Sequence, residues 1–354
     1  MRIFQNFKRL FKVIIFLGFL SVLLLMADCK KEQAKKENKA GGYSIGVLLA
    51  YDSPSSLEVF EAIKQQLEDY QKKSGQKLNI IVEKAHGQVP LLSGQAARLA
   101  SSCKLLVPIS TPALQAAMIN TTNVPIVFAS VANPYLVRAG RTAVDHEARV
   151  TGVCSTAPIR QVIELVRRIL PQAKKIGTIW TPSEINSEYY LRIMEEAGGE
   201  LGLEIISQPI SGAQDIVQAV QHLVREKIDA FFPVSDNTIN ANFDLVVQLS
   251  EESNLPLFSA FTLGAEFGAL ASMGFDYKNL GTRTAELIIR IIKGESPARI
   301  PFQYIDRIRF YLNEEQARKL GIKFPPELIK RADGLIKRSQ PVNNMVGQGV
   351  RRRL

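Results

Sequence analysis

Two short polar clusters contain the residues of this chain best suited to hold a charged ligand. Ser110-Thr111 offers hydroxyls at the start of a predicted helix, and Asp236-Asn237 offers a carboxylate and an amide at the start of another. Hydroxyls and N–H groups at a helix N-terminus favour an anion, whereas a buried carboxylate favours an ammonium group. The same residue types are also ordinary helix caps. Each cluster therefore has two interpretations, a ligand contact or a cap.

Sequence patterns typical of catalysis, metal binding or phosphate binding are missing. The chain has no G-x-S-x-G, no H-E-x-x-H and no phosphate-binding glycine loop, and its three His residues are scattered. Gly198-Gly199 and Gly202 follow a predicted helix and precede a predicted strand, an order that ends a helix rather than binding phosphate. We expect a binding protein and not an enzyme, with no metal site and no cofactor.

The segments that position the two polar clusters occur twice, about 130 residues apart. Ile45–Leu49 is matched by Ile176–Trp180, and three more segments recur in the same order: 78–81 as 203–206, 106–110 as 231–235, and 123–127 as 254–258. Predicted helices separate these strands, which is typical of parallel sheets with helices on both faces. We predict an α/β fold of two similar doubly wound parallel-sheet lobes, joined by a hinge, with a ligand cleft between them. A single large sheet is the alternative, which four ordered matches disfavour.

The predicted elements set the boundaries of the two lobes. Strands are expected at 44–49, 78–82, 104–108, 126–129 and 151–153, and again at 175–180, 203–207, 230–234, 257–259 and 269–273. A last strand is predicted over 302–312. We assign 43–155 plus 276–296 to lobe 1 and 156–275 plus 297–322 to lobe 2. Residues 323–354 are expected to form a C-terminal helix and a disordered tail.

The first 42 residues indicate export and anchoring. A basic segment ending at Lys12 precedes an uncharged run from Val13 to Ala27, which suits a signal peptide and is short of the ~20 residues of a transmembrane helix. Cys29 follows Asp28 and resembles the lipid-accepting cysteine of a bacterial lipobox, although Asp28 is not the usual small residue. We predict a signal peptide over 1–28, lipidation of Cys29, and a flexible tether over 29–42. An uncleaved membrane anchor is the alternative.

The net charge of +10 lies mostly at the two ends of the chain. Residues 1–40 carry a net +6 and residues 339–354 a further +3, which leaves about +1 for the body between them. A nucleic-acid-binding protein should carry its basic stripe on the fold itself, so we expect no nucleic-acid partner. Cys103 and Cys154 lie in apolar, strand-like contexts and are predicted to be buried free thiols. We expect a monomer.

Several separated motifs resemble those of a single family. They are Thr151–Val153, Pro158–Gln161, Leu170–Gly177, Pro182–Ser187, Ser235–Thr238, Gly274–Tyr277 and Ala317–Ile322. Together they resemble the ABC transporter substrate-binding family that includes tryptophan- and tyrosine-binding lipoproteins, over about residues 43–335. The resemblance implies the type I periplasmic-binding-protein fold, with three crossings between the lobes.

The resemblance also implies a function and a location. It implies a lipid-anchored protein at the cell membrane, facing the periplasm or the cell exterior, that delivers a small molecule to an ABC permease with a cytoplasmic ATPase. An aromatic amino acid is the first expectation for that molecule. A sensory protein that passes occupancy to a membrane signalling partner is the alternative, because the fold alone does not separate the two.

The strand carboxyl ends and the resemblance together predict the ligand contacts, because ligands bind open α/β sheets at those ends. The candidates are Tyr51, Ser110, Thr111, Ser130, Ser183, Asn186, Asp236, Asn237, Phe261 and Asp276. Phe275 and Tyr277 join Tyr51 as potential aromatic walls, although Phe275 is equally suited to the core and Asp276 to the hinge. For a zwitterionic ligand, Ser110-Thr111 would hold the carboxylate and Asp236 the ammonium.

Overall fold

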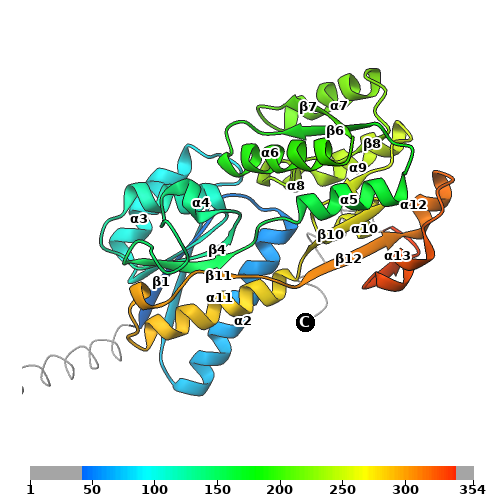
Figure 1. Cartoon of the computed structure of the whole chain (residues 1–354). Helices are drawn as coiled ribbons and strands as arrows, with labels where there is room; N and C mark the ends of the chain where they lie inside the picture. Colours follow the sequence, from blue (N-terminus) through cyan, green and yellow to red (C-terminus); the bar gives the residue numbers. More distant parts are fainter. Residues whose placement is uncertain (1–41, 340–354) are drawn as a thin grey trace, which may run out of the picture.

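The computed structural model describes residues 42–339, which form two α/β lobes (Figure 1). The sheet of the first lobe is parallel throughout. Its strands lie in the order β2 (Leu78–Lys84), β1 (Tyr43–Leu49), β3 (Leu105–Ile109), β4 (Ile126–Val131), β5 (Val150–Cys154) and β11 (Gln303–Tyr304).

The second lobe repeats this strand order. Its strands are β7 (Glu204–Pro209), β6 (Lys175–Trp180), β8 (Ala230–Phe231), β9 (Phe258–Ser259), β10 (Ala271–Phe275), β12 (Ile308–Asn313) and β13 (Gly334–Ile336). A parallel bridge between Phe231 and Leu257 connects β8 to the segment that leads into β9. Only β12 among these strands runs antiparallel to its neighbour β10. The predicted duplication is confirmed, because the first four strands of each lobe are arranged in the same order.

Helices cover both faces of the first sheet. Side chains alternate along a strand, so Ile45, Val47 and Leu49 of β1 pack towards α2 (Pro54–Ser74), while Leu48 packs towards α3 (Leu91–Ser102) and α4 (Thr111–Asn120). α11 (Tyr277–Ile292) lies beside α2 although it is far away in sequence (Figure 1). Each large aliphatic side chain buried in this way contributes about 1.5–3 kcal/mol, which fixes the strand ends that surround the site.

Helices also cover both faces of the second sheet. α5 (Ile159–Ile169) packs with α6 (Ile185–Glu200), and α7 (Ile216–Arg225) packs with α9 (Phe243–Glu252). The segment between β8 and β9 forms two helices rather than one, because α8 (Asn237–Ala241) ends at Asn242, whose amide bonds back to the Thr238 carbonyl. The shorter elements are η1 (Pro134–Val137), η2 (Ala213–Asp215), α10 (Gly264–Phe267) and η3 (Pro297–Arg299).

The chain crosses between the lobes after β5, after β10 and after β11. The third crossing differs from the prediction, which made 302–312 one strand and placed residues from 297 onward in lobe 2. Gln303 and Tyr304 pair with β5 of the first sheet, whereas β12 pairs with β10 of the second. Asp306 and Arg307, both exposed, separate the two strands. The apolar alternation continues across this break, which is why the sequence pattern conceals it.

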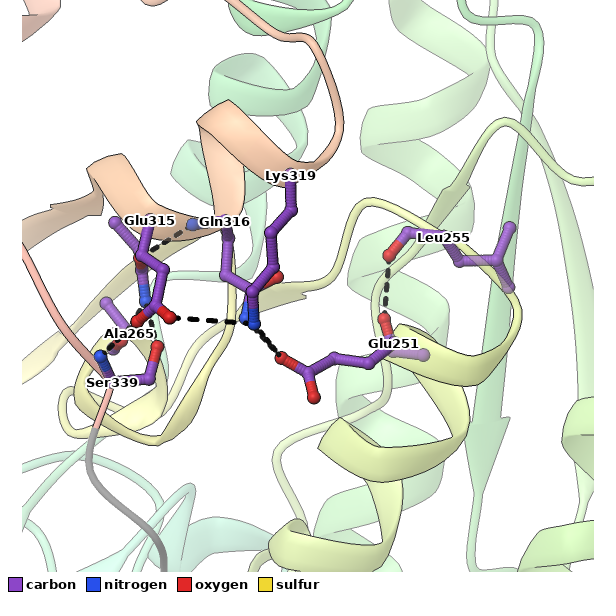
Figure 2. Close-up of polar contacts among 9 residues, drawn as sticks. Glu251, Leu255, Ala265, Glu315, Gln316, Lys319 and Ser339 are labelled. Carbon is purple, nitrogen blue, oxygen red and sulfur yellow. Dashed lines mark hydrogen bonds and ion pairs between the residues drawn. The ribbon is translucent and has the colours of Figure 1, made fainter.

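The segment predicted as a helix and tail from residue 323 is partly built into the second lobe. α13 (Pro326–Arg331) is followed by β13, which pairs with β12. Figure 2 shows that Gln316 and Lys319 of α12 (Glu314–Lys319) both contact Glu251 of α9, with the Lys319 ammonium 3.1 Å from its carboxylate. Glu315 accepts a bond from the Ser339 backbone at 2.6 Å. Residues 323–339 therefore belong to the second lobe.

The predicted signal peptide, Cys29, most of the tether and the tail over 340–354 lie outside the described residues. Within 42–339, no helix combines the length and the apolar character needed to cross a membrane. Cys103 and Cys154 are free and buried, as predicted.

Candidate ligand-binding site

A cavity lined by both lobes lies at the carboxyl ends of their strands. Its first-lobe wall consists of Ser55, Ser56, Thr111, Ser130 and Ala132. The second lobe and the crossings supply Ser155, Ala157, Asn186, Tyr190, Ser235, Asn237, Asn240, Ala260, Phe275 and Tyr277. Within residues 42–339 no lining side chain carries a formal charge. The cavity therefore offers hydroxyls, amides and aromatic rings to a ligand.

Two helix N-termini form the first-lobe wall. The Ser53 hydroxyl caps α2 by accepting a bond from the Ser56 N–H at 3.3 Å, and Pro54 fixes the first turn. α4 begins at Thr111, whose hydroxyl accepts a bond from the Ala132 N–H at 3.3 Å. The uncapped N–H groups and the dipoles of both helices make this wall attractive to an anion.

Ser110 precedes α4 in a strained conformation. Its φ of 98° lies in the left-handed region that favours glycine. Its hydroxyl is buried and has no partner in the described part of the chain. Ser110 does not itself line the cavity, so the predicted Ser110-Thr111 pair contributes only its second member to the lining.

A buried carboxylate, Glu184, organises the second-lobe wall. Glu184 is fully buried in the loop before α6. Its Oε1 accepts bonds from the Thr238 N–H at 2.9 Å and the Thr238 hydroxyl at 2.8 Å. Its Oε2 accepts bonds from the Asn237 N–H at 3.1 Å and the Asn237 amide at 2.5 Å, and a longer one of 3.4 Å from Asn186. All these partners are donors, so the side chain acts only as an acceptor.

Asp236 lies next to this carboxylate but faces the interior of the lobe. One oxygen caps α8 by accepting a bond from the Ile239 N–H at 2.8 Å, and the other accepts bonds from Ser187 at 2.7 Å and Thr181 at 3.1 Å. Burial raises the pKa of the Asp236 carboxyl, and the nearby charge of Glu184 raises it further. Because Asp236 does not line the cavity, the structure places it as a helix cap and not at the predicted ammonium contact.

Tyr51 joins the lobes instead of forming an aromatic wall of the cavity. Its hydroxyl lies 3.3 Å from the Thr238 hydroxyl of the second lobe. Burial, and then the charge of Glu184, raises the pKa of the Tyr51 phenol, so this group remains a hydrogen-bond donor.

The remaining candidates divide between the cavity and the framework around it. Thr111, Ser130, Asn186 and Asn237 line the cavity, as do the possible walls Phe275 and Tyr277. Ser183 is exposed in its loop. Phe261 is fully buried in an aromatic cluster, with its ring centroid 5.6 Å from that of Phe243. Asp276 caps α11 and pairs with Arg309 at 3.1 Å, beside the second crossing.

Sequence reasoning missed several residues that shape the site. Ser55 and Ser56 lie in the first turn of α2, where Ser is an ordinary capping residue, although they also follow a strand carboxyl end. Tyr190 lies within α6, where no strand-end rule applies. Its hydroxyl accepts a bond from the Ala157 N–H at 3.0 Å and donates to the Ser155 carbonyl at 3.3 Å, which holds the first crossing against the cavity.

The sequence model of one protein family, described as ABC transporter substrate binding protein, matches residues 44–336. The chain belongs to this family.

Individual relatives of this substrate-binding protein agree with the assignment. The Tyrosine-binding protein of Clostridioides difficile is 29% identical over 295 residues, which is 83% of this chain and 84% of that protein. A solved ABC domain in complex with L-Trp from Streptococcus pneumoniae is 27% identical and superposes with a TM-score of 0.77, covering 82% of this chain and all of that one. The fold is the predicted two-lobed type I periplasmic-binding-protein architecture.

A third relative bears on the arrangement of the two lobes. The ligand-free, open structure of a substrate-binding protein with adhesive properties from Clostridium difficile is 26% identical and covers 84% of this chain and all of that one. Its TM-score is only 0.62. The substrate-binding protein described here therefore resembles the L-Trp complex more closely than the open form, in agreement with the direct contact between Tyr51 and Thr238.

Proposed function

We propose that this protein is the lipid-anchored, extracytoplasmic substrate-binding component of an ABC importer and that its ligand is an aromatic amino acid. The observation that carries the proposal is the lining of the cavity between the lobes. Hydroxyls, amides and helix N-termini line it together with the rings of Tyr190, Phe275 and Tyr277.

Both parts of an aromatic amino acid match this lining. Its carboxylate and ammonium need hydrogen-bonding groups once they leave water. Its ring gains about 0.5–1.5 kcal/mol from each well-placed aromatic neighbour beyond the burial of apolar area. A sugar would use the hydroxyls and amides but would bring no aromatic ring to Tyr190, Phe275 and Tyr277.

The relatives support the same ligand class. One is named a tyrosine-binding protein, and a solved relative holds L-Trp. Both align with most of this chain, so the regions that form the cavity lie within the compared segments.

The export and anchoring features support the importer role. A signal peptide over 1–28 and lipidation of Cys29 would hold the two lobes at the outer surface of the membrane on a short tether. Ligand binding between the lobes favours their closed arrangement, and the closed arrangement presents a different surface to a permease from the open one.

Thermal unfolding with a panel of ligands tests the proposal. A ligand present at 100 times its dissociation constant stabilises the folded protein by about 2.7 kcal/mol. We expect tyrosine, tryptophan or phenylalanine to raise the melting temperature, and leucine, glutamate, sugars and nucleosides to leave it unchanged. A shift with a sugar or nucleoside but with no aromatic amino acid would show that the ligand class is wrong.

A further inference from the structure

The Glu184 carboxylate fixes the direction of two amide side chains at the cavity wall. An ionised carboxylate only accepts hydrogen bonds, whereas an Asn amide has a donor end and an acceptor end. Asn186 and Asn237 therefore turn their NH₂ groups towards Glu184, at 3.4 Å and 2.5 Å. The reverse orientation would place an amide oxygen against a carboxylate oxygen, with no proton between them.

This direction leaves an acceptor without a partner at the cavity wall. Asn186 and Asn237 both line it, and Asn186 is only 3% exposed. With its NH₂ group on Glu184, Asn186 presents its Oδ1, which has no hydrogen-bond partner within the described residues. A buried acceptor without a partner is unfavourable, and a hydrogen-bond donor on the ligand would satisfy it.

The two walls also differ in electrostatic character. Glu184 lies buried behind the second-lobe wall, and among residues 42–339 no Lys or Arg forms an ion pair with its carboxylate. The first-lobe wall includes the N-terminal ends of α2 and α4, which carry partial positive charge. The cavity is thus polarised from one lobe to the other.

We propose that Glu184 is a positioning residue that sets this polarity, so that Asn186 Oδ1 binds the ammonium of the ligand and the first-lobe helix ends bind its carboxylate. The proposal rests on the proposed function, because it assigns an orientation to the amino acid within the cavity. It also replaces Asp236 as the group that selects an ammonium, because the oxygens of Asp236 are used within the lobe.

The test compares tyrosine with its des-amino analogue, 3-(4-hydroxyphenyl)propionate, by calorimetry. The wild type should bind tyrosine at least about 30-fold more tightly than the analogue. This factor corresponds to the free energy lost when one partner of a buried charged hydrogen bond is removed. Glu184→Gln supplies a donor of its own, which lets the Asn186 amide turn its NH₂ group into the cavity. The ratio of the two dissociation constants should then fall close to one, chiefly through weaker tyrosine binding.

Glu188→Gln is the matched control, because it makes the same chemical change on the exposed side of the first turn of α6. The control should keep the wild-type ratio. Should Glu184→Gln fail to fold, Asn186→Ala removes the acceptor and leaves Glu184 in place. It should weaken tyrosine at least about tenfold and leave the des-amino analogue unchanged.

The possible outcomes separate the inference from the proposed function. A purely structural role for Glu184 would weaken both ligands equally, and an unchanged ratio in the folded variants would overturn the inference. Equal binding of tyrosine and its analogue by the wild type would overturn it too. If no aromatic amino acid binds the wild type, the proposed function fails, and with it the assignment of an ammonium to this wall.

Discussion

The phenol of Tyr51 in the first lobe lies 3.3 Å from the hydroxyl of Thr238 in the second. Thr238 uses its one hydroxyl proton on Glu184, at 2.8 Å, so Tyr51 must be the donor of the bond between the lobes. A side-chain hydrogen bond supported by a buried carboxylate therefore holds the two walls of the cavity together.

Tyr51→Phe should weaken ligand binding without altering either wall of the cavity. The variant keeps the ring and removes a hydrogen bond that joins the two lobes, so it should favour their separation. A net value of about 0.5–1.5 kcal/mol for one hydrogen bond predicts a roughly 2- to 12-fold rise in the dissociation constant, chiefly through faster release. Stopped-flow fluorescence measures both rates.

Tyr135→Phe is the control for this experiment. Its hydroxyl bonds to that of Tyr304 at 2.6 Å, and both residues belong to the first lobe. Tyr135→Phe should therefore leave the rate of ligand release unchanged. Equal release rates in Tyr51→Phe and the wild type would show that the Tyr51–Thr238 bond does not hold the lobes closed.

Ser110→Gly should not lower stability, unlike most changes in a buried segment. Relief of the strained φ is worth about 1–3 kcal/mol, and the added flexibility of glycine costs about 0.5–1 kcal/mol. Ser110 makes no side-chain capping bond. Ser53→Ala, which removes the cap of α2, should instead cost about 1 kcal/mol. Urea unfolding measures the free energy of unfolding of both variants. If Ser110→Gly lowers this free energy as much as Ser53→Ala does, the assignment of strain to Ser110 is wrong.

The buried Asp236 should make stability depend on pH. Its pKa is raised in the folded protein, so between the unfolded value of about 4 and the raised folded value, only the folded state holds this proton. The free energy of unfolding should therefore fall as pH rises through this window, by up to about 1.4 kcal/mol per pH unit. Asp236→Asn should flatten this slope. Parallel slopes for variant and wild type from pH 5 to 7 would argue against the raised pKa.

Gly281 should be intolerant of a side chain because α11 and α2 approach each other closely there. A Cβ at Gly281 would lie 2.5 Å from the Val59 carbonyl oxygen and 2.6 Å from the Ala62 side chain. Gly281→Ala should thus cost about 1–3 kcal/mol. A Cβ at Gly199 in α6 would have no neighbouring atom within 4 Å. Gly199→Ala should therefore raise the free energy of unfolding by up to about 1 kcal/mol, because Ala favours the helix. Similar melting temperatures for the two variants would contradict this packing.

Cys29→Ala should release the protein from membranes or leave it as a longer precursor, because lipidation requires the thiol. Cys103→Ala is the control, since Cys103 is buried within the first lobe. Membrane fractionation and the mass of the product show the effect. A Cys29→Ala protein with wild-type size and wild-type membrane association would exclude the lipid anchor.

Much of the fold was predictable because buried parallel strands are continuous apolar runs between recognisable helix caps. Gly75, for example, ends α2 with a φ of 69°, as expected of a glycine cap. The split between β11 and β12 was not predictable, because its only local sign is the exposed pair Asp306-Arg307 within an alternating pattern. β13 is only three residues long and depends on β12 for its pairing.

The site was predictable to the level of its loops but not of its side chains. Strand ends pointed to the loops of Thr111, Ser130, Asn186 and Asn237, and all four residues line the cavity. Of the two neighbouring carboxylates, Glu184 bonds to the Asn side chains of the cavity wall and Asp236 caps α8. This difference depends on tertiary packing that no local sequence pattern records. The sequence analysis therefore selected Asp236 and missed Glu184. Phe261 also follows a strand end, but its ring gains more from Phe243 and the core than from the cavity.

Native mass spectrometry of the purified protein tests the central claim most directly. The protein would be incubated with an equimolar mixture of the standard amino acids, a nucleoside and a hexose labelled with ¹³C at every carbon, which separates the mass of the hexose from that of tyrosine. The cavity described here predicts one added molecule per chain, with the mass of tyrosine, tryptophan or phenylalanine. An added hexose or nucleoside, or no added mass at all, would contradict the assignment of this cavity to an aromatic amino acid.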